Sequence, residues 1–193
     1  MRLLVDVDNV LADFGSEFER VLRDRGAYIP TKLKSSYYLE EAYSLPRAVV
    51  AAAIRDMDAS KIPIVKGAKD FIDRALTLEY NVYFVTSYPA VEGLPVYGWR
   101  DKRDEWLQEH FGELGKNVVH TGHKYLCDGD VFIDDKPSNV FTWAKHHRDK
   151  RALLWSQFHN LKESLPLLPK LFRVGSFSAA EMHLVMEKSH AEG

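Results

Sequence analysis

The sequence lacks several features that would place it in common classes of protein. It has one cysteine, Cys127, so an internal disulfide framework is excluded and a reducing compartment is expected. No apolar run approaches the roughly 20 residues that span a bilayer, so we expect no membrane partner. It also has no internal repeat, low-complexity segment or glycine-rich phosphate loop.

Excess charge of either sign is missing as well. The chain has 26 basic and 28 acidic residues and a net charge of -2, so no nucleic-acid polymer is expected as a partner. Its histidine pairs, at 120 and 123 and at 146 and 147, have no second pair of ligands beside them and favour core or surface histidines over a zinc site. An apolar run follows Met1 and Arg2 directly, so we expect no targeting segment and a cytoplasmic protein.

What the sequence does have is a distinctive start. Residues 3 to 14 open with a short, β-branched apolar run that predicts a buried central strand. Asp6 and Asp8 follow, alternating with valines, where this strand would leave its sheet. They could be incidental acids at a solvated strand end, but buried carboxylates are costly unless something neutralises them.

Further along, apolar runs alternate with segments of helical spacing, in a chain of 193 residues that is 46% hydrophobic. This alternation predicts a parallel α/β sheet, Rossmann-like and flanked by helices, with right-handed crossovers. A last helix is expected near Ser178. The expected strands after the first are 82–85, 117–121, 131–133 and 152–155.

Residues 27 to 64 break the alternation. They carry no strand signal, and an alanine-rich helix is expected from Pro46 to about Asp58. Four tyrosines crowd the segment, where they could contact a ligand or equally pack between helices. These are Tyr28, Tyr37, Tyr38 and Tyr43.

Polar side chains follow the later strands too. Thr86 and Ser87 follow the second, Lys124 lies in the loop after the third, and Asp134 and Asp135 follow the fourth. Each taken alone is compatible with a turn or a solvated surface charge. Ligands of open α/β sheets bind outside the carboxyl ends of the strands, so together these residues predict a site there.

These positions resemble the motifs of the haloacid dehalogenase-like phosphohydrolases. Asp6-Val7-Asp8 resembles motif I, Thr86-Ser87 motif II, Lys124 motif III and Asp134-Asp135 motif IV. Residues 6–14, 106–112 and 155–160 look like the 5'(3')-deoxyribonucleotidase branch in particular. That branch usually has glycine where this chain has Asn9, but asparagine tolerates the left-handed backbone angles of a tight turn.

The resemblance implies an architecture and a chemistry. Residues 1–26 and 65–193 would form the core, and 27–64 a small helical cap inserted after the first strand. Asp6 would be the nucleophile that forms an aspartyl-phosphate, and Asp8 the general acid and base. Mg²⁺ would be held by Asp6, the main-chain carbonyl of Asp8 and Asp134, with Asp135 in support. The implied phosphate-binding residues are Asn9, Thr86, Ser87 and Lys124.

The substrate implied is a small phosphomonoester, in this branch a (deoxy)nucleoside monophosphate. Base selectivity would come from the four cap tyrosines and from Tyr88, Tyr97 and Trp99 in and after the motif II loop. The alternatives are a phosphatase for another phosphorylated metabolite and a noncatalytic nucleotide-binding protein. Asp8 argues against the latter, because binding alone needs no acid there.

Overall fold

The computed structural model describes residues 1–91 and 93–191, apart from the side chains of residues 96 and 97. Its centre is one sheet of six parallel strands in the order β3-β2-β1-β4-β5-β6. This confirms the predicted parallel α/β fold. The strands are β1 (Arg2–Val5), β2 (Asn81–Thr86), β3 (Val118–His120), β4 (Val131–Asp134), β5 (Arg151–Trp155) and β6 (Leu171–Val174).

The central strands are apolar because the sheet is covered on both faces. Leu3 and Val5 of β1 belong to the larger apolar core, whereas Leu4 belongs to a second core with Trp143. Alternate side chains of a strand point to opposite faces, so the two cores lie on opposite sides of the sheet. A continuous apolar run therefore predicted β1 correctly.

Four helices accompany the sheet. Helix α6 (Pro137–His146) contacts β4 and β5, while α4 (Ala68–Thr77) contacts β2 and packs against α7 (Phe177–Ala191). The long helix α5 (Val96–Phe111) buries Trp106 in the larger core and continues into the short 3₁₀ helix η1 (Gly112–Lys116). A second 3₁₀ helix, η2 (Lys124–Leu126), follows β3.

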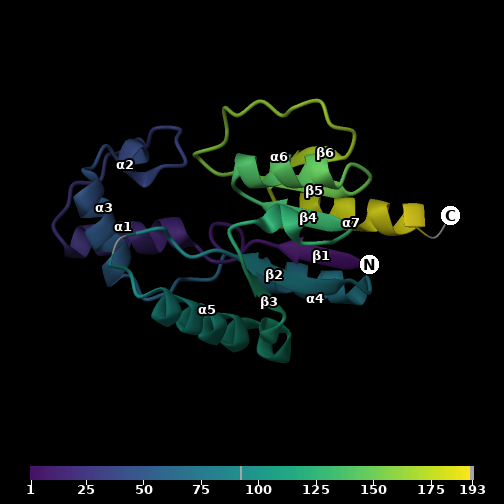
Figure 1. Cartoon of the computed structure of the whole chain (residues 1–193), viewed down its shortest axis with the longest axis horizontal. Coiled ribbons are helices and arrows are strands. Elements are labelled where there is room, and N and C mark those ends of the chain that lie inside the picture. The colour runs from purple at the N-terminus through teal and green to yellow at the C-terminus, as the bar shows by residue number, and fades with distance from the viewer. Residues whose placement is uncertain (92, 192–193) are drawn as a thin grey trace.

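Three further helices lie together at the carboxyl ends of the strands, away from both termini (Figure 1). They are α1 (Phe14–Asp24), α2 (Leu39–Ala42) and α3 (Arg47–Asp56). Helix α3 contacts both α1 and α2. Asp13 caps α1 by accepting a hydrogen bond from the Ser16 amide, and Gly26, at φ 66°, lies just beyond its end.

The chain passes between the sheet and these three helices along two adjacent segments. On the way out, the Asp13 amide donates to the Pro63 carbonyl at 2.7 Å. On the way back, the Val65 amide donates to the Leu11 carbonyl at 2.7 Å. Residues 11–13 and 63–65 therefore form a hydrogen-bonded pair of connections.

Two details at the C-terminal side differ from the sequence prediction. Strand β6 was not predicted, and α7 begins at Phe177, whereas capping by Ser178 would have started the helix at Ala179. The Ser176 hydroxyl accepts a hydrogen bond from the Ala179 amide at 3.1 Å, so the capping residue lies two positions earlier than expected. Within the described residues, no helix combines the length and apolarity needed to cross a membrane.

Candidate active site

The site is organised by the turn that follows β1. Asp6 comes directly after the strand, and its amide donates to the Ile133 carbonyl of β4 at 2.9 Å. The chain then folds back, with the Leu11 and Ala12 amides both donating to the Val7 carbonyl. Asn9 has φ 60°, so it adopts the left-handed conformation that the sequence allowed for at this position.

Asp6 and Asp134 meet because β1 and β4 are neighbours. From β1 the chain adds β2 and then β3 on one side of the sheet. From β4 it adds β5 and then β6 on the other side. The carboxyl ends of β1 and β4 thus flank the topological switch point where such folds bind ligands.

Lys124 links these two carboxylates from η2. Its Nζ lies 2.6 Å from Asp6 Oδ1 and 2.8 Å from Asp134 Oδ2, and only 3% of its side chain is exposed. Burial lowers the pKa of Lys124, but the two carboxylates outweigh this effect and raise the pKa above its ordinary value. Lys124 is therefore a charged ammonium group and not a solvated surface lysine.

The loop after β4 is fixed by many hydrogen bonds. Asp134 accepts from the Lys136 amide at 2.7 Å and from the Asn139 amide group at 3.0 Å. The Asp135 carbonyl accepts from the side chains of His159, at 3.1 Å, and Asn160, at 2.7 Å. His159 and Asn160, which lie in the 155–160 stretch that resembles the deoxyribonucleotidase branch, thus hold this loop in place.

Negative charge exceeds positive charge in this cluster. Carboxylate oxygens of Asp6, Asp134 and Asp135 all lie within 4.8 Å of one another, and the Lys124 ammonium group pairs with the first two. Burial, followed by repulsion from Asp134, raises the pKa of Asp6 to about 8. Burial also raises the pKa of Asp135 well above its usual range.

This surplus fits a divalent cation. Three carboxylates and one ammonium group leave two uncompensated negative charges, and Asp135 Oδ2 is buried without a hydrogen-bond partner. Oxygen donors of this kind suit a hard ion such as Mg²⁺. The three carboxylates therefore fit one such cation, which would keep several waters as further ligands.

Asp8 is held from a different direction. Arg103 of α5 donates from Nη2 to Asp8 Oδ1 at 2.5 Å. The sequence analysis did not predict a role for Arg103. The sequence did carry a signal for one, since Arg103 lies between Trp99 and Trp106 on the buried face of its helix. A charge on an otherwise apolar face needs a partner.

The two hydroxyl residues after β2 occupy different places. Ser87 is exposed and lines the cavity described below. Thr86 is buried at the end of the strand, and its hydroxyl lies 3.4 Å from the Ser87 carbonyl.

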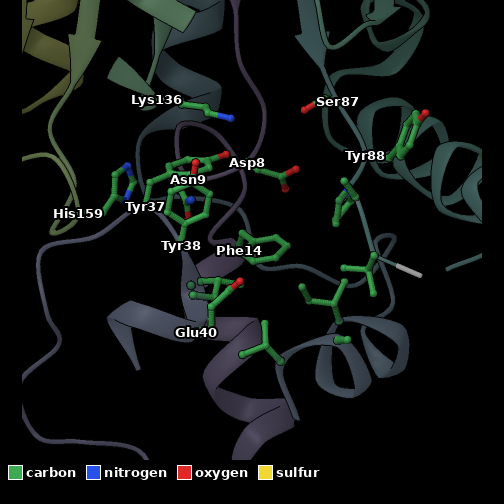
Figure 2. A pocket seen from close by; sticks show the side chains of 18 of the residues that line it. Asp8, Asn9, Phe14, Tyr37, Tyr38, Glu40, Ser87, Tyr88, Lys136 and His159 are labelled. Atoms are coloured by element: carbon green, nitrogen blue, oxygen red, sulfur yellow. The ribbon is translucent and has the colours of Figure 1, made fainter. Parts of the chain in front are cut away.

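A cavity of about 1020 Å³ opens between the strand ends and helices α1, α2 and α3. Figure 2 shows Asp8, Asn9, Ser87 and Lys136 around one end of it, with Tyr37, Tyr38 and Phe14 nearby and Glu40 beyond. Lys124 and Asp135 also line this end. The cavity is therefore polar at the strand ends and becomes aromatic towards the helices.

The aromatic residues proposed for selectivity fall into two groups. Tyr37, Tyr38, Tyr43 and Tyr88 line the cavity. Of these, Tyr43 is buried, packs edge-on against Phe18 and donates to Glu19.

Two others, Tyr28 and Trp99, do not line the described cavity. Tyr28 is 74% exposed elsewhere on the surface, and Trp99 is buried behind Phe14, with ring centres 6.5 Å apart. Tyr97 belongs to α5, and its side chain lies outside the part of the chain that the structure describes.

Lys136, following Asp135, also reaches the cavity. Its Nζ lies 4.4 Å from the centre of the Tyr37 ring, and this ring meets His159 edge-on at 5.3 Å. The structure places a second cation at the polar end of the cavity.

Comparison with known proteins agrees with this geometry. The chain is 26% identical over 188 residues to the mitochondrial 5'(3')-deoxyribonucleotidase of Mus musculus, covering 92% of this chain and 82% of that protein. It is 26% identical over 148 residues to the human cytosolic type, covering 70% of this chain and 71% of that protein. The chain resembles the 5'(3')-deoxyribonucleotidases. No protein-family model matches it.

The fold is that of the haloacid dehalogenase-like hydrolases. A hydrolase of this group from Deinococcus radiodurans, solved with bound phosphate and sodium, aligns with a TM-score of 0.58 at 12% identity. The alignment covers 96% of this chain and 95% of that structure. In this deoxyribonucleotidase-like chain, the fold brings the residues that resemble motifs I, III and IV into one buried cluster, with Ser87 of motif II at the cavity.

Proposed function

We propose that this chain is a magnesium-dependent phosphatase that hydrolyses nucleoside monophosphates, with a (deoxy)ribonucleotide as substrate. One observation supports this reading above the others. Asp6 and Lys124 lie in contact at the polar end of a cavity that becomes aromatic a short way further on. A nucleotide has the same order of parts, from phosphate to sugar to flat base.

The first chemical step transfers the phosphoryl group to the enzyme. A carboxylate oxygen of Asp6 attacks phosphorus, and the bond from phosphorus to the nucleoside oxygen breaks. Asp8 gives its proton to that oxygen, so the nucleoside leaves as a neutral alcohol. Lys124, Ser87 and Asn9 all line the cavity, where their side chains would stabilise the oxygens of the group in transfer.

The second step returns the enzyme to its starting state. Asp8, now ionised, takes a proton from water while the water oxygen attacks phosphorus. The bond between phosphorus and the Asp6 oxygen breaks, inorganic phosphate leaves, and Asp6 is again a carboxylate. Asp8 is protonated again, so no proton is gained or lost by the enzyme over the cycle.

The cation-binding residues in this proposal are Asp6 and Asp134, with the Asp8 carbonyl, and Asp135 in support. When bound, Mg²⁺ would offset the repulsion between an anionic nucleophile and a phosphate dianion. The chain's own contribution is to keep the carboxylates together, which it does through Lys124, Asn139 and the Lys136 amide.

A phosphate-release screen tests the proposal. Purified protein would be assayed with nucleoside 5'- and 3'-monophosphates and common sugar phosphates, with Mg²⁺ and with excess chelator. We expect release from nucleotides that requires the metal. Faster release from sugar phosphates would favour a phosphatase for another metabolite. Full activity in excess chelator would refute the role of the metal. Nucleotide binding without any phosphate release would favour the noncatalytic alternative.

Selectivity for a base is predicted to depend on Tyr37 or Tyr38. Stacking of a base on an aromatic ring is worth roughly 1 to 3 kcal/mol, so alanine at one of them should lower kcat/KM for a nucleotide by roughly 5- to 150-fold. Turnover of a small aliphatic ester such as glycerol phosphate should change little, because it has no ring to stack on a tyrosine.

Tyr28→Ala serves as the matched control, since Tyr28 belongs to the same segment but lies outside the cavity. It should leave both substrates unaffected. Equal losses on both substrates in the Tyr37 and Tyr38 variants would show that these tyrosines are structural.

A further inference from the structure

Arg103 is an unusual residue for the middle of a buried helix face. It lies on α5, 95 residues away from Asp8 in the sequence, and is 1% exposed. Its guanidinium group rests beside the Trp106 ring, 5.4 Å from the ring centre, and Nη2 contacts Asp8 Oδ1. The remaining donors, Nε and Nη1, are buried and have no hydrogen-bond partner.

This arrangement is a poor way to stabilise a fold. Removing a guanidinium group from water is costly, and unpaired buried N–H groups add to that cost. Replacing a buried ion pair as a whole with well-packed apolar side chains of similar volume is often neutral or stabilising. What Arg103 does gain is one directional contact, with the carboxylate of Asp8.

We propose that Arg103 is a positioning residue that fixes the Asp8 side chain for proton transfer, an inference that rests on the proposed phosphatase function. The contact holds Oδ1 from the α5 side, while Asp8 lines the cavity and points into it (Figure 2). The second oxygen is thereby left to meet the leaving oxygen in the first step and water in the second.

Lys124 cannot take over this task. Its ammonium group already pairs with Asp6 and Asp134. Without Arg103, Asp8 loses its only ion pair among the described residues and can rotate away from the reacting atoms. A general acid must lie within hydrogen-bond distance of the atom that it protonates, and a misplacement of about 1 Å can cost on the order of 100-fold in rate.

The test uses Arg103→Met, which keeps most of the side-chain volume and the contact with Trp106. With a nucleotide, whose leaving alcohol needs a proton, kcat should fall by roughly 10- to 100-fold with KM changed little. With p-nitrophenyl phosphate, whose leaving group needs none, the aspartyl-phosphate should still form. Its hydrolysis should be slow, so rapid quenching should trap more phosphoenzyme than in the wild type.

A second variant separates positioning from general damage. In an Asp8→Asn background, Arg103→Met should cause almost no further loss, because the residue through which it acts has already lost its role. Arg100→Met, on the same helix, should behave like the wild type in every assay. Because Arg103→Met leaves Asp8 without its ion pair, Tm should fall, and all activities are therefore compared at a temperature well below the Tm of the variant.

Three outcomes would overturn the inference. The first is an additive loss of kcat in the double variant. The second is a rise in KM at unchanged kcat, which would make Arg103 a substrate-binding group. The third is an equal slowing of phosphoenzyme formation with the nucleotide and with p-nitrophenyl phosphate. Failure of the underlying function is recognised separately, because the wild-type protein itself would then release no phosphate from any ester.

Discussion

Replacing Asp6 with asparagine is expected to lower the kcat of phosphate release by on the order of 10⁴-fold or more. A loss of this size is typical when a covalent nucleophile is removed. The carboxamide has the same shape but cannot act as the nucleophile. The measurement is steady-state phosphate release with Mg²⁺, together with acid quenching to look for phosphoenzyme. Neither product should appear.

The fold should survive this change. Asparagine fills the same volume, and Lys124 keeps its pair with Asp134 at 2.8 Å. One of the three clustered carboxylates disappears, which relieves their mutual repulsion, so the metal-free Tm should be unchanged or higher. A soluble, folded Asp6→Asn protein with most of the wild-type rate would remove Asp6 from the role of nucleophile.

Lys124→Met should combine a large loss of activity with a loss of stability. The reaction loses a preorganised cation near the transferring phosphoryl group, at a cost of roughly 10²- to 10³-fold in kcat. The folded protein loses the ammonium group that pairs with Asp6 and Asp134, and breaking such a buried pair destabilises by about 3 to 5 kcal/mol. Denaturant unfolding in chelator would measure the second effect.

Magnesium should distinguish the two effects in this variant. The carboxylates of Asp6, Asp134 and Asp135 are left without their lysine, so adding Mg²⁺ should raise Tm more than it does in the wild type. Activity should stay low, because the metal does not replace the lysine. Lys145→Met, an exposed lysine on α6, is the control. An equal effect of Mg²⁺ on the Tm of the Lys124→Met variant and of the wild type would contradict a cation site among these carboxylates.

The parts of the fold that the sequence predicted are those encoded by local patterns. The apolar runs of β1 and β4 are short, β-branched and buried on both faces, so their residues alone imply central strands. Because parallel strands end at one edge of a sheet, the acids of these two strand ends were expected at the same edge. The contact between Asp6 and Asp134 also requires that β1 and β4 are neighbours, which the structure shows and the local patterns do not encode.

The parts that were not predictable depend on distant contacts. Strand β6 is only four residues long, includes Arg173 and forms the edge of the sheet, so it lacks a strong periodic signal. Arg103 pairs with Asp8, which lies 95 residues earlier in the sequence, so no local pattern links the two. The tyrosines of residues 27 to 43 looked alike in sequence, and only their packing separates the cavity-lining Tyr37 from the exposed Tyr28.

The paired connections between the sheet and helices α1, α2 and α3 act mechanically as a double-stranded hinge. The outgoing and returning segments are hydrogen-bonded to each other through residues 11–13 and 63–65. Any swing of the three helices must bend both segments together, and the outgoing one begins only three residues after Asp8. The opening angle of the cavity and the backbone of the reactive turn are therefore coupled to one another by covalent geometry.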